Sequence, residues 1–338
     1  RGHHLYQMLA MNAETGKLRT VVEERANTFV NYGRLWRQFI KDGKQLLWMS
    51  ERDNWNHLYL YDVQKSKVIR QITKGEWFVR GIQRVDEEKG EIYFSASGVN
   101  KNEDPYLVHY YKIGIDGKNM VALTPEEGNH SVQYTYDYRY LLDTYSKVDA
   151  APVTVLRDAQ TGKLVKTLET ADIATLKKHG WVAPEVFVAK GRDGKTDMWG
   201  IIQRPTNFDP NKKYPVIEYI YSGPGDAYTP KSFMPYNWYT TSLAELGFIV
   251  VQLDAMGTSY RGKKFEEVCY KTVNSGSRLQ PRSILIWMLI MWQSMAVRQA
   301  DRRVPQPYCC MAISTRQPIV PVAVTTTGWI KSGGTSNG

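Results

Sequence analysis

The sequence has few cysteines and no long apolar run, and these shortages exclude several classes of protein. Its 338 residues include three cysteines, Cys269, Cys309 and Cys310. Three thiols at this spacing give neither a disulfide framework nor a pair of zinc-ligand motifs. The longest apolar stretch, residues 284–292, is about half of the roughly 20 residues that a membrane-spanning helix needs. We therefore expect no structural zinc and no membrane span.

The first residues lack the basic start, apolar run and small-residue cleavage site of a signal peptide. We expect the chain to begin inside a domain.

Acidic residues are scarce in one part of the chain only. The net charge is +10, but residues 272–338 hold seven basic residues against one acidic residue, Asp301, and so contribute +6 of it. The remaining +4 is spread over 271 residues without a basic stripe or a recognition helix. Because nucleic-acid binding needs clustered positive charge, the composition argues against it.

Helical periodicity is almost absent from residues 1 to about 175, where strand-like runs alternate with tight polar turns. The turns at residues 14–17, 64–67, 116–118 and 160–163 recur roughly every 44 to 52 residues, the spacing of propeller blades. Further strands are expected at residues 45–50 and 91–97. A β-sandwich is the alternative, but the repeated turn favours a propeller. About four blades would not close a ring, so we expect more blades before residue 1.

The pattern changes near Trp181, and residues 184–194 indicate a strand and a turn that open a second unit. Strands are expected at residues 198–204, 214–221 and 248–253, with a helix over 238–246 that stops at Gly247. Strands with an intervening helix indicate an α/β fold with a mostly parallel sheet covered on both faces.

Two segments of this second unit, YPVIEYIYSGPG (214–225) and GFIVVQLDAMGTSYRG (247–262), resemble the start of the α/β-hydrolase domain of prolyl oligopeptidase-family serine peptidases, in the dipeptidyl peptidase IV branch. SERDNWNHLYLYD (50–62) resembles a propeller blade of the same branch. The resemblance implies a multidomain protein: a partial β-propeller over residues 1–180, then the start of an α/β-hydrolase domain over 184–271. It implies peptide substrates, a secreted or periplasmic location, and a family in which homo-oligomers can form. It implies neither a metal nor an organic cofactor.

The resemblance also gives roles to single residues. A tyrosine hydroxyl before Gly-Pro donates to the oxyanion in this family, and Tyr221 matches it. Gly223 and Pro224 would shape the loop that follows, and Asp254 with Gly257 the next loop.

The catalytic residues that should follow are missing. The sequence has no G-x-S-x-G elbow, and its histidines end at His179, before the hydrolase strands. When the codons of residues 284–336 are shifted in frame, permitted bases encode a strand, a GGSAGG elbow and a helix. The elbow serine then falls at the position of Arg298. We therefore interpret residues 272–338 as an out-of-frame tail.

Two functions follow from these observations. The first is a serine peptidase that releases N-terminal dipeptides through an acyl-enzyme, with this polypeptide itself inactive. The second is a non-catalytic propeller module or pseudoenzyme scaffold, which the missing nucleophile and histidine favour for this exact chain. The acidic pair that binds a substrate's amino terminus in the family is not identifiable.

Overall fold

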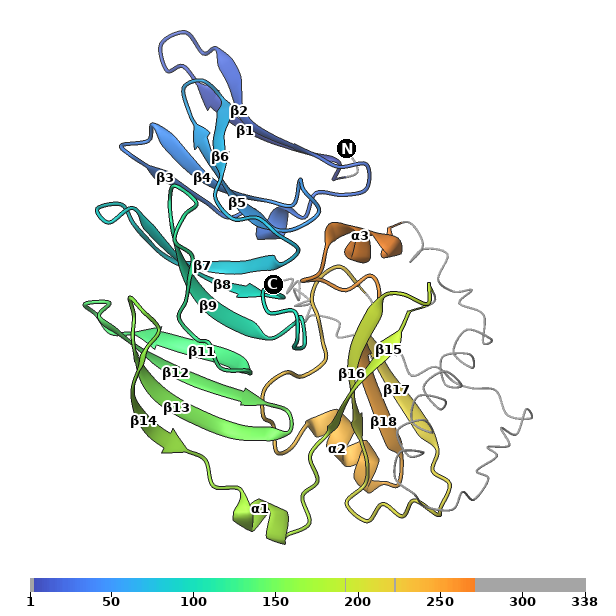
Figure 1. Cartoon of the computed structure of the whole chain (residues 1–338). Coiled ribbons are helices and arrows are strands. Elements are labelled where there is room, and N and C mark those ends of the chain that lie inside the picture. The colour runs from blue at the N-terminus through green and yellow to red at the C-terminus, as the bar shows by residue number, and fades with distance from the viewer. Residues whose placement is uncertain (1–2, 192, 222, 271–338) are drawn as a thin grey trace, which may run out of the picture. The chain divides into compact units, whose positions relative to one another are not determined.

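The computed structural model describes residues 3–191, 193–221 and 223–270, apart from three side chains, those of Ile220, Tyr221 and Cys269. These residues belong to one compact unit and form five β-sheets (Figure 1). The predictions for residues 272–338, including the position of Arg298, lie outside this range. The short helices are η1 (Tyr32–Arg34), α1 (Ala174–Lys178), α3 (Lys263–Glu266) and η2 (Glu267–Cys269).

Three successive sheets are four-stranded antiparallel meanders, which we call blades. The first contains β3 (Arg37–Ile40), β4 (Gln45–Ser50), β5 (His57–Asp62) and β6 (Lys67–Gln71). The second contains β7 (Phe78–Asp86), β8 (Glu91–Ser97), β9 (Val108–Gly114) and β10 (Val121–Ala122). The third contains β11 (Asn129–Tyr134), β12 (Tyr140–Lys147), β13 (Ala150–Asp158) and β14 (Leu164–Thr170). A hairpin of β1 (Leu5–Met11) and β2 (Leu18–Arg25) precedes them.

The repeated turn occupies one place in every blade, between the third and fourth strands, and it also closes the β1–β2 hairpin. In three of the turns a side-chain oxygen, Asn12 Oδ1, Asp62 Oδ1 or Asp158 Oδ1, accepts a 2.8 Å hydrogen bond from the amide three residues later. The next residue has a positive φ each time: 66° at Gly16, 54° at Ser66 and 72° at Gly162. A β-carbon on Gly162 would lie 2.5 Å from the Ala122 carbonyl oxygen of the preceding blade. Close packing of two blades therefore also requires this glycine.

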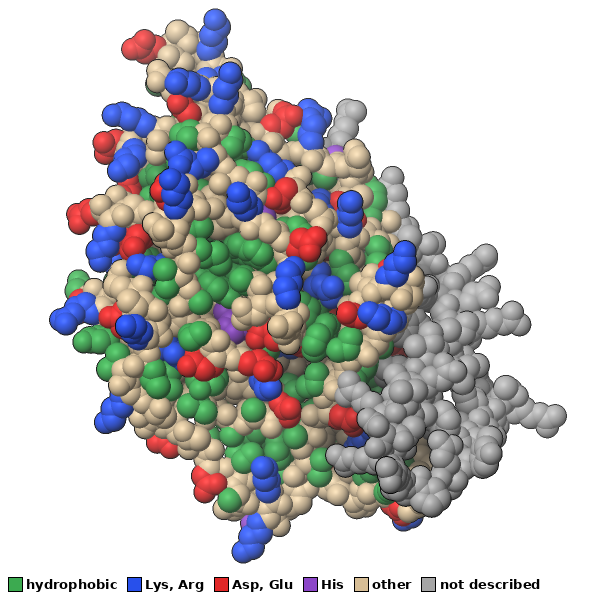
Figure 2. Space-filling model, in the orientation of Figure 1, with side chains coloured by type: hydrophobic (Ala, Val, Ile, Leu, Met, Phe, Trp, Pro, Cys, Tyr) green, Lys and Arg blue, Asp and Glu red, His purple; other side chains and the backbone are tan. Residues whose placement is uncertain are grey.

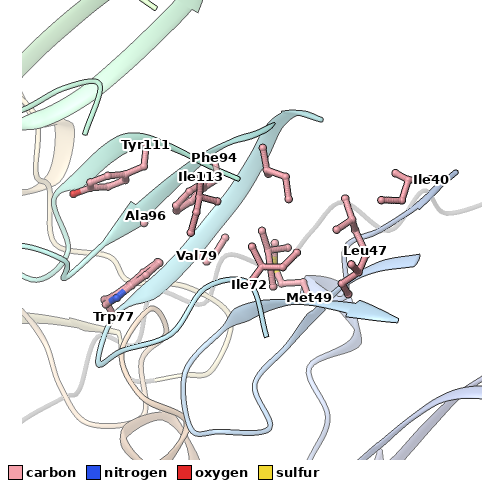
Figure 3. Packing of buried hydrophobic residues seen from close by; sticks show 13 residues of the cluster. Ile40, Leu47, Met49, Ile72, Trp77, Val79, Phe94, Ala96, Tyr111 and Ile113 are labelled. Carbon is pink, nitrogen blue, oxygen red and sulfur yellow. The ribbon is translucent and has the colours of Figure 1, made fainter. Parts of the chain in front are cut away.

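Strand β4 buries side chains on both of its faces. Leu47 and Met49 belong to one hydrophobic cluster with Val79 and Phe94 of the second blade (Figure 3), whereas Leu46 and Trp48 pack with Val22 of β2. A sandwich covers only one face of each sheet, whereas a propeller blade packs against a neighbour on each side. The described blades therefore exclude the sandwich, and the propeller-like arrangement is confirmed.

The fifth sheet contains β15 (Glu185–Lys190), β16 (Asp197–Gln203), β17 (Val216–Tyr221) and β18 (Ile249–Asp254), in the order β15-β16-β18-β17. The expectation of a mostly parallel sheet is wrong for the described residues, because only β17 and β18 are parallel. A short turn joins β15 to β16 and forces them antiparallel, whereas the connection from β17 to β18 includes a helix.

That helix is α2 (Trp238–Glu245), which agrees closely with the predicted one. It begins after Asn237, whose side chain accepts hydrogen bonds from the amides of Tyr239 and Thr240. It ends before Gly247, which has a φ of 94°. The crossover therefore brings the ends of β17 and β18 to the same edge of the sheet.

Candidate active site

The parallel pair places Tyr221 and Asp254 opposite each other at the ends of β17 and β18. The loops that continue from these strands therefore start side by side. In open α/β sheets, ligands bind at such carboxyl ends. The backbone thus brings together the two loops that the sequence singled out.

Asp254 holds the first loop through its side chain, which is fully buried. Its Oδ1 accepts hydrogen bonds from the amides of Tyr228 (2.6 Å) and Thr229 (3.2 Å). Burial raises the pKa of the Asp254 carboxyl, while Lys231 and the two amides oppose that shift. These contacts support a conformational role for Asp254.

Lys231 connects this loop to the second blade. Its Nζ lies 2.7 Å from Asp104 Oδ2 and 3.8 Å from Asp254 Oδ2. Nearby, the Tyr106 hydroxyl lies 3.4 Å from Thr258 Oγ1 of the second loop. Both loops are therefore attached to the segment that leads into β9.

The predicted loop-shaping residues have distinct environments. The Pro224 carbonyl oxygen accepts hydrogen bonds from Ser259 Oγ (2.8 Å) and Arg34 Nη2 (3.0 Å). Gly257 has a φ of 111°, and its amide donates to the Phe265 carbonyl oxygen at 2.8 Å. Gly223 is partly buried where the first loop begins. Pro224 thus joins the two loops, and Gly257 allows the turn in the second.

Arg34 lies at the centre of a charged cluster that the sequence did not reveal. Its Nη1 is 3.2 Å from Glu51 Oε1 and 3.0 Å from Glu266 Oε2. Burial alone lowers the pKa of its guanidinium, but Glu266 and Glu51 outweigh this effect and raise it. The guanidinium also lies over Phe78 and Tyr260. Arg34 is therefore held rigidly next to the Pro224 carbonyl.

A cavity of about 1000 Å³ adjoins this cluster. Its lining includes Trp36, Phe78 and Arg80 from the blades, and Pro224 and Tyr260 from the two loops. Pro224 follows Tyr221 closely in the chain, so the cavity is continuous with the loop after the predicted oxyanion strand. Pockets of this size accommodate ligands the size of a short peptide.

The described residues contain neither a metal-binding group nor a membrane-spanning helix. None of their His, Cys, Asp and Glu side chains gather in a group of three that could hold a metal ion. Among the same residues, no helix is long and apolar enough to cross a membrane. On the face seen in Figure 2, acidic and basic side chains are mixed over the described blades.

Comparison with known proteins finds a matching family model and several related proteins. Residues 1–152 match the family described as "Dipeptidyl peptidase IV (DPP IV) N-terminal region". Dipeptidyl peptidase 4 of Trichophyton rubrum is 30% identical over 230 residues, which are 66% of this chain and 29% of that protein. The chain thus spans less than a third of this relative's length.

Solved structures agree over a longer stretch. The crystal structure of Porphyromonas gingivalis dipeptidyl peptidase 4 matches 79% of this chain and 37% of its own, with a TM-score of 0.64 and 24% identity. A structure from Bacteroides ovatus matches 81% and 42%, with a TM-score of 0.66 and 27% identity. The blades and the fifth sheet therefore share their fold with these proteins.

Proposed function

We propose that the chain is part of a serine peptidase of the dipeptidyl peptidase IV-like family, which releases N-terminal dipeptides from peptides. The observation that supports this function best is the adjacent placement of Tyr221 and Asp254, with the cavity beside their loops. The proposed domains are a partial propeller over residues 1–180 and the start of a hydrolase domain over 184–271.

In the proposed reaction, an elbow serine attacks the substrate carbonyl after a histidine has taken its proton. The carbonyl oxygen becomes negatively charged and needs donors placed in advance. One donor is the amide next to the nucleophile. The other is the Tyr221 hydroxyl. The peptide C–N bond then breaks, the histidine gives its proton to the leaving amine, and water hydrolyses the resulting acyl-enzyme to release the dipeptide and the free serine. Gly223, Pro224, Asp254 and Gly257 keep the two loops in position.

This polypeptide itself should be inactive. Its sequence has no G-x-S-x-G elbow and no histidine after His179. We propose that residues 272–338 are read out of frame, with the nucleophile lost at the position of Arg298. The second candidate function, a non-catalytic propeller module, rests on the same absence of elbow and histidine.

Two proteins should be compared in one assay. The chain as printed should neither hydrolyse dipeptidyl-proline or dipeptidyl-alanine reporters nor react with a fluorophosphonate probe. A protein with the frame restored near codon 272 and extended to the length of its relatives should do both. If that extended protein is also inert, the peptidase proposal fails and the binding module is favoured.

A further inference from the structure

Arg80 lies at an irregularity in β7 that directs it away from the regular ladder. Val79 pairs with Ala96 and Gly81 pairs with Ser95, so Arg80 is an extra residue opposite the partner strand β8. Such bulges turn a side chain into a new direction and are common next to active sites. Here the side chain lines the cavity together with Pro224 and Tyr260.

The guanidinium of Arg80 is stacked on Tyr260, and no acid in the described part of the chain forms an ion pair with it. Its carbon lies 3.2 Å from the centroid of the Tyr260 ring. Among the described residues, no carboxylate oxygen comes within ion-pair distance of it and no hydrogen bond from it is found. Burial lowers the pKa of Arg80, while Tyr260 and Asp226 attract the charged form. The side chain retains some exposed surface, and its contact with the cavity accounts for this.

Two other arginines show what is unusual about Arg80. Arg34 contacts the same Tyr260 ring at 5.4 Å, but Glu51 and Glu266 neutralise it. Arg84, four residues later on β7, is stacked on Tyr138 at 3.9 Å and pairs with Asp86 at 2.9 Å. Arg80 has the aromatic contact, but no described acid forms an ion pair with it. Within residues 3–191, 193–221 and 223–270, the cavity therefore contains a cation without a paired anion.

Tyr260 is fixed in a position that supports this cation. Its φ of 68° is rare for a bulky side chain, and Phe78 packs edge-on against its ring at 5.6 Å. Non-glycine residues hold such a backbone only when their surroundings enforce it, often at functional sites. An arginine stacked on a ring keeps the edge of its guanidinium available for two parallel hydrogen bonds.

We propose that Arg80 is a specificity-determining residue that binds a carboxylate of a peptide in this cavity. The inference rests on the proposed peptidase function and adds to it a preference for acidic peptides. A single planar cation matches a carboxylate in charge and in geometry. The carboxylate can belong to an aspartate or glutamate side chain or to the carboxyl terminus of a short peptide.

Binding to the chain as printed tests the inference without catalysis. Three probes are titrated by calorimetry: Ala-Pro-Glu-Ala amide, Ala-Pro-Gln-Ala amide, and Ala-Pro-Gln-Ala with a free carboxyl terminus. A charged hydrogen-bonded pair should make at least one carboxylate peptide bind about 10- to 100-fold more tightly than the neutral amide. The first and third probes separate the side-chain source from the terminal source.

Variants assign the effect to this residue. Arg80→Gln should abolish the preference, and Arg80→Lys should keep a weaker one, because it retains the charge and loses the planar fork. Arg84→Gln on the same strand is the matched control and should keep the full preference. Melting curves confirm that each variant is folded.

Equal affinity for the three peptides, or no binding of any, would overturn the inference. So would a preference that survives Arg80→Gln or disappears in Arg84→Gln. These results would leave the peptidase proposal intact, because hydrolysis of neutral dipeptidyl reporters by the extended protein tests that proposal separately.

Discussion

Arg34 and Glu266 form an ion pair with an Nη1–Oε2 distance of 3.0 Å, although 232 positions separate them in the sequence. Arg34 belongs to η1, which precedes the first blade, and Glu266 ends α3, which follows the fifth sheet. The pair therefore connects the blades to the segment after β18. Its side chains are 14% and 2% exposed, so solvent screens it little.

Arg34→Gln should destabilise the chain strongly, because it removes the guanidinium that lies between the buried carboxylates of Glu51 and Glu266, although Lys263 still lies 3.4 Å from Glu51. Breaking a buried pair on one side costs about 3–5 kcal/mol, measurable as a lower midpoint of urea unfolding. Arg25→Gln is the control: its pair with Glu23 is on the surface and should contribute below about 1 kcal/mol. Similar midpoints for the two variants would show that the Arg34 cluster contributes little.

His109 should make stability depend on pH. Burial alone lowers its pKa, but the Glu103 carboxylate, the Thr124 carbonyl and Asp143 together raise it above the usual value. Glu103 Oε1 lies 2.7 Å from Nε2, and the His130 ring packs at 4.8 Å. Because the pKa is raised in the folded chain, protonated His109 stabilises the fold. This stabilisation is complete below about pH 6.5, the pKa of histidine in the unfolded chain. It is then lost as the pH rises through the folded value.

The test compares melting temperatures of wild type and His109→Gln from pH 5 to pH 9. The difference should be largest in acid and should shrink as the pH rises. His179→Gln, at the exposed residue that follows α1, serves as a control that should follow the wild-type profile. A constant difference between wild type and His109→Gln would refute the linkage.

Substitution of Glu218 on β17 should stabilise the chain, in contrast to the substitutions of Arg34 and His109. Burial raises the pKa of Glu218, so its charged form is unfavourable in the folded chain. Its favourable contribution is complete below the unfolded pKa of about 4.3 and is lost as the pH rises through the raised value. Glu218→Gln should therefore gain stability over wild type between pH 4 and pH 8. Glu169→Gln, on exposed β14, should show no such trend in the same melting series.

The sequence predicted local structure well where one pattern was sufficient. The strands expected at residues 45–50 and 91–97 coincide with β4 and β8, because each is an apolar run bounded by turn residues. The orientation of β16 was not predictable, since it pairs with β18 about 50 residues later. Such pairing depends on tertiary contacts rather than on local propensity.

The sequence pointed to candidate site residues only where a family motif marked them. The resemblance of residues 214–225 and 247–262 to a peptidase hydrolase domain is what suggested Tyr221 and Asp254. Arg34 and Arg80 carried no such signal. A single arginine in a β-rich segment is ordinary. The two acids that pair with Arg34 are 17 and 232 positions away in the sequence, and no acid among the described residues pairs with Arg80. Their significance depends on the cavity, which exists only in the folded chain.

Tyr221→Phe tests the proposed oxyanion donor in the extended protein with its frame restored. The substitution removes one hydroxyl and keeps the ring, so β17 and its pairing with β18 should persist. Loss of one oxyanion donor lowers kcat by about 10²- to 10³-fold. KM should change little, since the interaction forms mainly in the transition state. Tyr219→Phe is the matched control: it lies on the same strand, and its hydroxyl donates to that of Tyr228 at 3.0 Å. It should keep most of the activity. Equal rates for Tyr221→Phe and wild type would remove Tyr221 from the mechanism and leave the family assignment unchanged.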